Sequence, residues 1–308
     1  CTGHSKAQYS LSMLPWTRVA NQGAVPPALT NFGIVSSGCK LYVFGGIAEL
    51  ADNSYDLSCD FYIFDESTGF WTCKERTDLQ PCARTGHSMV TWQERIFVLC
   101  GCTGHSKAPN YLSDVFSFNI ESSDWRPLTT GGVQPVARAY AGAACIKNRL
   151  FLFGGLNGPF ARNYRNDLNI LDLATLTWSL CLPRNESPCG RSNFSMCAFG
   201  GQLYVFGGVH LIEGHRSALG DLHIFDPHRE TWESPPPSDP SPSLRSGHAM
   251  CACAGGVFLH GGVESAEDGQ AMDGWWVLNP ASRRWHQLGP SEAAASGSLR
   301  GAFVRQAP

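Results

Sequence analysis

Basic side chains that could bind a carboxylate are concentrated in three short segments of this 308-residue chain. The three groups are His105 and Lys107, then Arg162 and Arg165, then His210, His215 and Arg216. Arginine suits this task because its planar guanidinium can donate two parallel hydrogen bonds to one carboxylate. The pattern predicts a site for a peptide with an acidic group or a C-terminal carboxylate. The alternative is that these are solvated loop charges without a ligand.

Acidic side chains occupy two comparable segments nearer the ends of the chain. They are Glu49, Asp52 and Asp56 in the first segment, and Glu264, Glu267 and Asp268 in the second. If all five segments surround one opening, a basic arc faces an acidic arc. Such complementary potentials orient a charged ligand.

Residue patterns for catalysis or metal binding are weak in this chain. Cys100 and Cys102 with His105 could form a metal cluster, but a strand end that runs into a loop gives poor tetrahedral geometry. The sequence contains no Gly-x-Ser-x-Gly, His-Glu-x-x-His or Gly-x4-Gly-Lys-Ser/Thr motif. We therefore predict no catalytic residue, no bound metal and no cofactor.

The charged segments each follow a recurring pair of small residues. The pairs are Gly45-Gly46, Cys100-Gly101, Gly154-Gly155, Gly207-Gly208 and Gly261-Gly262, so their second positions are 55, 54, 53 and 54 residues apart. Tryptophans keep the same step at Trp16, Trp71, Trp125, Trp178, Trp232 and Trp285. An aspartate precedes five of them by eleven or twelve residues, at Asp60, Asp114, Asp167, Asp221 and Asp273. The chain is therefore a repeat array with a unit of about 54 residues.

Each unit is predicted to contain four short β-strands. The apolar runs are four to seven residues long, rich in Val, Phe, Tyr and Ile, and bounded by Gly, Pro, Asn and Asp. The five units span about 28–77, 83–130, 137–182, 190–235 and 244–288. An arginine recurs with the period, at Arg84, Arg138, Arg191, Arg245 and Arg300. We expect most of these arginines to serve the scaffold, by binding loop carbonyls or pairing with an acidic neighbour, and His87 and His248 to be scaffold as well.

The unit resembles the kelch repeat, a β-propeller blade with a glycine pair after its second strand and a tryptophan in its fourth. Residues 203–208, 221–226 and 231–232 match that pattern closely, and the resemblance covers almost the whole chain. It implies an all-β, six-bladed propeller in one domain, residues 1–308. Residues 1–20, with Trp16, and residues 298–308, with Arg300, are expected to form the closing blade, which looks incomplete because its second strand is not visible. Residues 1–7 are identical to residues 102–108.

In kelch propellers, partners commonly bind at the mouth of the central channel, in loops that follow each arginine and each glycine pair. Carried onto this chain, the resemblance implies a partner-binding set at that mouth. The set is Thr85, Lys107, Tyr140, Arg162, Arg165, Ser192, Asn193, Arg216 and Ser246.

The expected function is non-catalytic binding of a partner protein or peptide. The unit length resembles host cell factor and the kelch-domain substrate receptors of ubiquitin ligases, so a substrate receptor is the leading specific hypothesis. The first alternative is a scaffold in transcription, cytoskeletal or trafficking complexes. The second is an iron-dependent enzyme of the plant specifier type, but Met272 stands where its Glu-x3-Asp-x3-His motif, here starting at Glu264, requires histidine.

Composition narrows the class of partner and the compartment. The formal net charge is −3, which does not suggest a nucleic-acid-binding surface, and no run of 18 apolar residues suggests a membrane segment. The 13 cysteines are odd in number and scattered, so we expect buried, reduced thiols rather than disulfides or metal ligands. Cys251 and Cys253 are examples at alternating strand positions. A cytoplasmic or nuclear location is expected.

Overall fold

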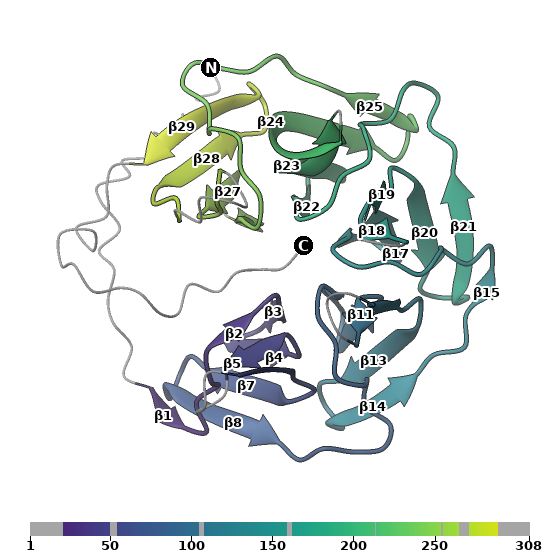
Figure 1. Ribbon diagram of the computed structural model, residues 1–308, viewed down its shortest axis with the longest axis vertical. Helices are drawn as coiled ribbons and strands as arrows, with labels where there is room; N and C mark the ends of the chain where they lie inside the picture. The colour runs from purple at the N-terminus through teal and green to yellow at the C-terminus, as the bar shows by residue number, and fades with distance from the viewer. Residues whose placement is uncertain are drawn as a thin grey trace, which may run out of the picture.

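A computed structural model describes residues 21–49, 54–104, 108–158, 162–212, 214–253, 255–264 and 271–288. Over these ranges the secondary structure consists of β-strands, and no helix there has the length and apolar character to cross a bilayer. Five antiparallel sheets, which we call blades 1 to 5, follow one another around a central axis (Figure 1). The prediction of an all-β protein is confirmed.

Each blade has four main strands in chain order, and the first strand lies nearest the axis (Figure 1). Blade 1 contains β3 (Gly33–Ser37), β4 (Lys40–Phe44), β7 (Phe61–Asp65) and β8 (Phe70–Lys74). Blade 2 contains β9 (Ser88–Trp92), β10 (Arg95–Leu99), β13 (Val115–Asn119) and β14 (Asp124–Pro127). Blade 3 contains β16 (Gly142–Ile146), β17 (Arg149–Phe153), β20 (Leu168–Asp172) and β21 (Thr177–Cys181). Blade 4 contains β22 (Ser195–Phe199), β23 (Gln202–Ile212), β24 (His215–Asp226) and β25 (Thr231–Glu233). Blade 5 contains β26 (Ala249–Cys253), β27 (Gly256–His260), β28 (Trp275–Asn279) and β29 (Arg284–Leu288).

Small hairpins extend the connection between the second and third strands. They are β5 (Ile47–Glu49) with β6 (Tyr55–Leu57), β11 (Cys102–Thr103) with β12 (Asn110–Tyr111), and β18 (Leu156–Asn157) with β19 (Asn163–Tyr164). In addition, β2 (Leu29–Thr30) pairs with β5. In blade 4 the long strands β23 and β24 cover the same region, with a register shift between Phe206 and Gly208. These extensions all lie at one end of the blades.

The small pairs bend each second strand and join neighbouring blades. Gly155 has a φ of +85°, and a Cβ there would lie 2.7 Å from the carbonyl oxygen of Ala139, so only glycine fits. In the first four pairs the amide of the second glycine donates to the carbonyl of the arginine that begins the next blade, as in Gly155 to Arg191 at 2.8 Å and Gly208 to Arg245 at 2.9 Å. The repeated glycine is therefore an inter-blade contact.

In three blades a buried periodic arginine forms an ion pair with a partly exposed aspartate. Arg138 is fully buried; its guanidinium donates to Asp167 at 2.9 and 2.7 Å and to the carbonyl of Gly154 at 3.0 Å. Arg84 with Asp114, and Arg191 with Asp221, repeat the two-pronged geometry. The expectation that these arginines hold the scaffold is confirmed.

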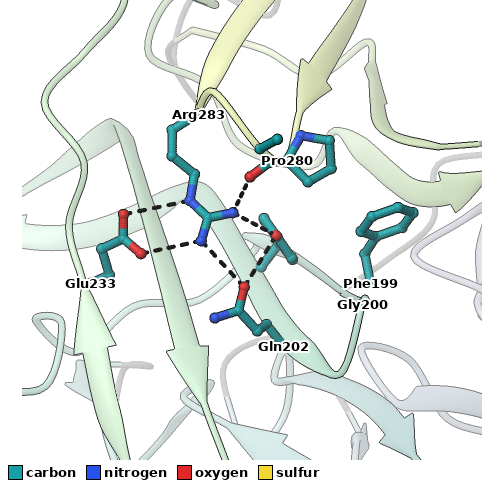
Figure 2. A pocket seen from close by; sticks show the side chains of 8 residues that line it. Phe199, Gly200, Gln202, Glu233, Pro280 and Arg283 are labelled. Carbon is teal, nitrogen blue, oxygen red and sulfur yellow. Dashed lines mark hydrogen bonds and ion pairs between the residues drawn. The ribbon is translucent and has the colours of Figure 1, made fainter. Parts of the chain in front are cut away.

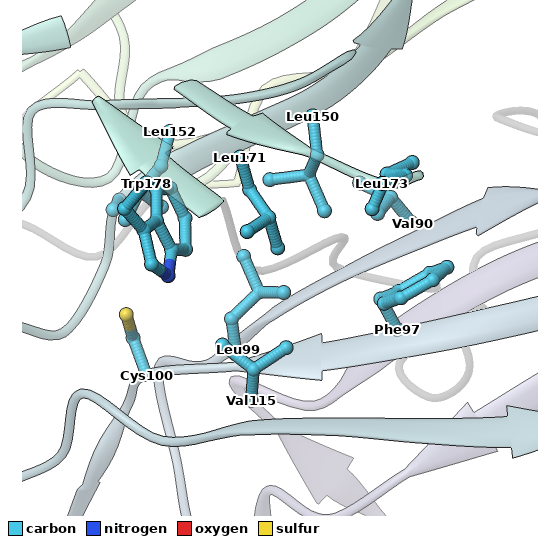
Figure 3. Packing of buried hydrophobic residues seen from close by; sticks show 11 residues of the cluster. Val90, Phe97, Leu99, Cys100, Val115, Leu150, Leu152, Leu171, Leu173 and Trp178 are labelled. Atoms are coloured by element: carbon cyan, nitrogen blue, oxygen red, sulfur yellow. The ribbon is translucent and has the colours of Figure 1, made fainter. Parts of the chain in front are cut away.

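Apolar side chains fill the space between blades. Figure 3 shows Leu99 and Cys100 of blade 2 facing Leu171 and Trp178 of blade 3. Trp178 is 1% exposed, so its large ring adds apolar area to a thin sheet that must pack face to face against its neighbour. His87 and His248 are completely buried at another inter-blade position, with the rings edge-on to Phe44 and Phe206.

The cysteines are not all buried as expected. The 12 cysteines among the described residues are all free thiols, but Cys251 and Cys253 on β26 are exposed, so the expectation that they are buried is wrong. The residues predicted to form the closing blade, 1–20 and 298–308, lie outside the described residues.

Candidate functional site

The entrance to the central axis is bordered by the start of each blade. Asn31, Gly86, Tyr140, Asn193 and Gly247 occupy one register there, and each has a φ between +53° and +62°. The amide of Tyr140 donates to the carbonyl of Gly86 at 2.7 Å, and that of Gly247 to Asn193 at 2.8 Å. Longer bonds of the same kind join Gly86 to Asn31 and Asn193 to Tyr140. One hydrogen-bonded arc therefore runs across all five blades, and we call this end the mouth.

Three tyrosines from blades 2 and 3 lie together at the mouth. Tyr111 on β12 and Tyr164 on β19 share a register, because they pair with Cys102 and Leu156 at equivalent places. The ring of Tyr140 lies over Gly86, where a Cβ would come within 2.9 Å of it. Burial raises the pKa of all three tyrosines, that of Tyr140 to about 12, so each keeps its hydroxyl proton at neutral pH.

Arg216 on β24 brings a positive charge to these tyrosines. The charge opposes the effect of burial on the pKa of Tyr111, Tyr140 and Tyr164, so it lies within electrostatic reach of all three. The Tyr164 hydroxyl also has hydrogen-bond contacts with Arg216 and Ser192. We call Tyr111, Tyr140, Tyr164 and Arg216 the tyrosine–arginine cluster. It combines rigid aromatic surface with an exposed guanidinium.

A hollow of about 580 Å³ adjoins this cluster between blades 3 and 4. Its lining includes Arg162, Tyr164, Arg165 and His210. The His210 ring meets the Tyr164 ring edge-on at 5.9 Å between centroids, so the aromatic surface continues into the hollow. Polar and aromatic groups thus converge in one concave region, which is the usual character of a ligand site.

The predicted basic residues differ in how free their charges are. Arg165 is bound to Asp167 at 3.3 Å, and the same carboxylate holds Arg138, so Arg165 is partly neutralised. Arg162 and Arg216 are exposed, and neither forms an ion pair with another described residue within 4.0 Å. Lys107 lies outside the described residues. The cations available to a ligand are therefore Arg162 and Arg216.

The predicted hydroxyl residues are close to the arc but covered. Thr85, Ser192 and Ser246 form single antiparallel bridges with Cys102, Val209 and Val263, and are at most 7% exposed. Asn193 and Tyr140 lie in the arc itself and are partly exposed. The structure thus brings Tyr140, Arg162, Arg165, Asn193 and Arg216 to the accessible mouth. It leaves Thr85, Ser192 and Ser246 beneath it.

The acidic segments lie on the other blades that border the mouth. Glu49 and Asp56 are exposed on β5 and β6 of blade 1, and Glu264 is exposed next to the Val263 bridge of blade 5. Asp52, Glu267 and Asp268 lie outside the described residues. Blades 2 to 4 therefore carry aromatic and basic groups at the mouth, and blades 1 and 5 carry acidic ones.

A second hollow, of about 560 Å³, lies between the strand turns at the opposite ends of blades 4 and 5. Figure 2 shows Arg283 at its centre, reaching Glu233, Gln202 and the carbonyl of Pro280. Arg283 also donates to the Tyr204 hydroxyl at 2.9 Å. With its donors engaged in this way, Arg283 fastens blade 5 to blade 4.

In the described ranges, three groups of residues can be compared with the requirements of a metal or nucleophile site. No three His, Cys, Asp or Glu side chains in the described parts of the chain are grouped to hold a metal ion. Cys100 and Cys102 are buried, which raises the pKa of their thiols to about 12 and 11. His223 links Ser234 to Asp221 through two 2.7 Å contacts, but Pro235 follows the serine and has no N–H to stabilise an oxyanion.

Tyr111 and Tyr164 were not among the residues predicted to bind a partner. A signal for them exists, because the dipeptide Asn-Tyr recurs at 110–111 and 163–164, one repeat apart and after a glycine pair. The tryptophans and the glycine pairs of the scaffold also recur at equivalent positions, so recurrence by itself does not mark a binding residue. At this register it instead places two aromatic rings at the mouth.

Comparisons with known proteins agree with the architecture. The family model of the KLHDC2/KLHL20/DRC7 Kelch-repeats domain matches residues 5–208 and 104–304. Kelch domain-containing protein 3 of Bos taurus is 26% identical over 291 residues, which cover 90% of this chain and 74% of that protein. Rab9 effector protein with kelch motifs of Homo sapiens is 32% identical over 196 residues, 59% of this chain and 50% of that protein. Host cell factor of Drosophila melanogaster is 28% identical over 286 residues, 82% of this chain but 18% of that protein. The resemblance inferred from the repeats is confirmed: the chain belongs to the kelch-repeat family.

Proposed function

We propose that this chain is a non-catalytic interaction module that binds a partner protein or peptide at the mouth of the propeller. The observation that carries the proposal is the tyrosine–arginine cluster beside the hollow that contains Arg162. Tyrosines offer large contact area with few rotatable bonds, and they are enriched in protein interfaces. A rigid scaffold with divergent loops is also the usual arrangement for binding.

The chemistry of the mouth favours a peptide with an acidic or C-terminal carboxylate group. Arg162 and Arg216 can each present a guanidinium fork to a carboxylate, and the neutral tyrosine hydroxyls can donate further hydrogen bonds. Glu49 and Glu264, across the mouth, would repel the same group. The carboxylate is therefore expected over blades 3 and 4, with the rest of the peptide directed toward blades 1 and 5.

A peptide array tests this function. Random peptides with free C-terminal carboxylates are compared with the same peptides amidated, and acidic with neutral sequences. We expect binding to depend on the carboxylate, and Arg216→Glu or Tyr164→Ala to reduce it at least tenfold. Arg229→Glu, which changes an exposed arginine on the blade 4 turn, is the matched control. Equal binding by wild type and Arg216→Glu would contradict the assigned site.

The specific role we propose is a substrate receptor of a ubiquitin ligase. A reporter protein ending in an array-selected peptide should be degraded faster in cells that contain the full-length protein, and the Arg216→Glu variant should abolish the difference. The alternative is a scaffold in transcription, cytoskeletal or trafficking complexes, which the similarity to a Rab9 effector and to host cell factor supports. In that case the peptide binds but the reporter is stable.

We also propose a single domain of six blades, with residues 1–20 and 298–308 in the sixth. The support is that Trp16 and Arg300 continue the periods of the repeated tryptophans and arginines. A crystal structure of the complete chain that closes with five blades would contradict this. The free thiols of the described cysteines support a cytoplasmic or nuclear location, where reducing conditions prevail.

A further inference from the structure

In four of the five blades, the segment that leads into the blade is hydrogen-bonded to the outermost strand of that blade. In blades 1 and 3 the connecting segment forms a short strand, β1 (Gln22–Gly23) or β15 (Gly131–Gly132), parallel to β8 or β21. There the amide of Ala24 donates to the carbonyl of Trp71, and that of Val133 to Trp178, both at 2.9 Å. The segment thus covers the open edge of the sheet.

In blades 4 and 5 a side chain performs this task. The Asn185 amide group donates to the Trp232 carbonyl at 2.7 Å and accepts the Trp232 N–H at 2.8 Å. The Ser238 hydroxyl accepts the Trp285 N–H at 3.1 Å. In all four blades, therefore, the tryptophan of the outer strand is bonded to the connecting segment.

Blade 2 is the exception. Its connecting segment, residues 75–83, and its outer strand β14 are both described, and no hydrogen bond joins the segment to Trp125. The segment is held toward blade 1 instead. The Thr77 amide donates to the Gln80 side chain at 3.2 Å, Gln80 donates to the Cys59 carbonyl at 2.9 Å, and Arg76 binds Asp60.

The residues at and just before the contact position distinguish blade 2 from the other blades. Asp78 lies seven residues after a repeat tryptophan, as do Gly23, Gly132 and Asn185. A Cβ at Gly132 would lie 2.1 Å from the Trp178 carbonyl oxygen, so a residue with a side chain cannot take the place of that glycine. Asparagine replaces the backbone bonds with its amide group, but an aspartate carboxylate has no donor for the tryptophan carbonyl. Asp78 therefore cannot make both of these bonds. Blade 5 also has an aspartate at this position, Asp239, but there the preceding Ser238 accepts the Trp285 N–H; in blade 2 the preceding residue is Thr77, whose amide is bonded to the Gln80 side chain.

We propose that the β14 edge of blade 2 accepts an extended segment of a partner protein as an added parallel strand, with glycine opposite Trp125. Exposed strand edges are templates for such β-augmentation. The four other blades show the occupant: a short parallel segment with glycine, or a polar side chain such as that of Asn185, at this position. This surface is separate from the mouth and does not depend on the function proposed above.

The chain supplies its own probe for the experiment. A peptide copying residues 129–137, acetylated and amidated so that it has no terminal carboxylate, contains the Gly131–Gly132 strand. It is titrated into the isotope-labelled protein and followed by amide chemical shifts. Saturation is expected in the millimolar range, because each backbone hydrogen bond contributes only about 1 kcal/mol.

The largest shifts should fall on Trp125 and Arg126, with none at Trp232 or Trp285. The same peptide with Gly132→Ala should not bind, and the Asp78→Asn protein should bind at least fivefold more weakly because the introduced amide group can cover the edge from within the chain. Arg216→Glu should leave these shifts unchanged. Absence of shifts at β14, equal binding of the alanine peptide, or equal binding by the Asp78→Asn protein would overturn the proposal. So would concentration-dependent shifts at β14 without peptide, because the occupant would then be a second copy of this chain.

Discussion

The periodic arginine and its aspartate partner are both present in blades 2 to 4, whereas blades 1 and 5 each lack one of them. Arg84, Arg138 and Arg191 each donate two hydrogen bonds to the carboxylate of an aspartate. In blade 5, Gly274 stands where that aspartate would be, and Arg245 binds instead the carbonyls of Ser243 and Gly261 and the Ser243 hydroxyl. In blade 1, Asp60 is present but Leu29 replaces the arginine.

The blades differ in whether a carboxylate neutralises the positive charge of the buried guanidinium. Arg245 is 3% exposed, and burial lowers its pKa to about 10, against which only the charge of Glu264 acts. Burial has the same direction of effect on Arg84, but Asp114 outweighs it and the pKa is raised. The three blades with complete pairs are also those that carry the tyrosine–arginine cluster and the adjoining hollow. The proposed binding surface therefore lies on the blades in which each buried arginine is paired with an aspartate.

Removing the carboxylate from a complete pair should have the largest effect. Asp167→Asn leaves Arg138 buried without a counter-charge, so we expect the free energy of unfolding to fall by about 3–5 kcal/mol. Asp60→Asn is the matched control: its partner Arg76 is exposed, and a surface pair is worth about 0–1 kcal/mol. Urea denaturation measures both variants. Equal losses would show that the buried pairs do not distinguish blades 2 to 4.

Acidification should destabilise both kinds of blade through the buried histidines. Burial, and next the charge of Arg84 or Arg245, lowers the pKa of His87 and of His248 to about 3. The unfolded chain takes up protons below about pH 6.5 while the folded chain does not, so stability present above pH 6.5 is lost as the pH falls toward 3. The expected slope is about 1.4 kcal/mol per pH unit for each histidine.

Urea denaturation between pH 4.5 and 7.5 isolates this effect. The carboxylate of Asp167 is partly buried and held by Arg138, and its pKa of about 2 means that its contribution is lost only below about pH 4. Phe194 and Phe32 occupy the register of His87, so His87→Phe should lower the slope by about 1.4 kcal/mol per pH unit, while His248 and His260, whose pKa burial also lowers, keep contributing. The exposed His228→Gln is the control. An unchanged slope in His87→Phe would contradict the assignment.

The smallest expected effect is the difference in stability loss between matched substitutions in blades 5 and 4. Ser243 and Cys189 are equivalent, and each accepts a hydrogen bond from the buried arginine two residues later. Ser243→Ala should cost about 1–2 kcal/mol because Arg245 has few other partners, whereas Cys189→Ala should cost less than about 0.5 kcal/mol because Arg191 keeps Asp221. Thermal or urea unfolding tests the ranking. A larger loss for Cys189→Ala would reverse the comparison.

Much of the scaffold could be predicted because it repeats. The glycine pairs, the aspartates and the tryptophans defined the unit, and the periodic arginines were correctly assigned to the scaffold. The missing arginine of blade 1 is visible in the sequence, where Leu29 stands in its place, but the loss of the ion pair in blade 5 could not be foreseen in the same way. Asp273 keeps almost the right spacing to Trp285, but the strand register places Gly274, not Asp273, opposite the arginine.

The sequence predicted where the candidate site lies better than it predicted which residues form it. The charged residues Arg162 and Arg216 were found because they break the repeat. Tyr111 and Tyr164 were overlooked because they share one register, and Thr85, Ser192 and Ser246 were chosen although β-bridges bury them. Burial of a short bridge depends on pairing between distant loops, which spacing along the chain does not reveal.

The central claim is that blades 2 to 4 bind the partner at the mouth. Chemical-shift mapping with the tightest carboxylate-terminated peptide from the array tests it most directly. We predict the largest shifts at Tyr111, Tyr140, Tyr164 and Arg216, with little change at the turn that contains Arg283. Shifts centred on Arg283, Gln202 and Glu233, with none in the tyrosine–arginine cluster, would contradict the claim.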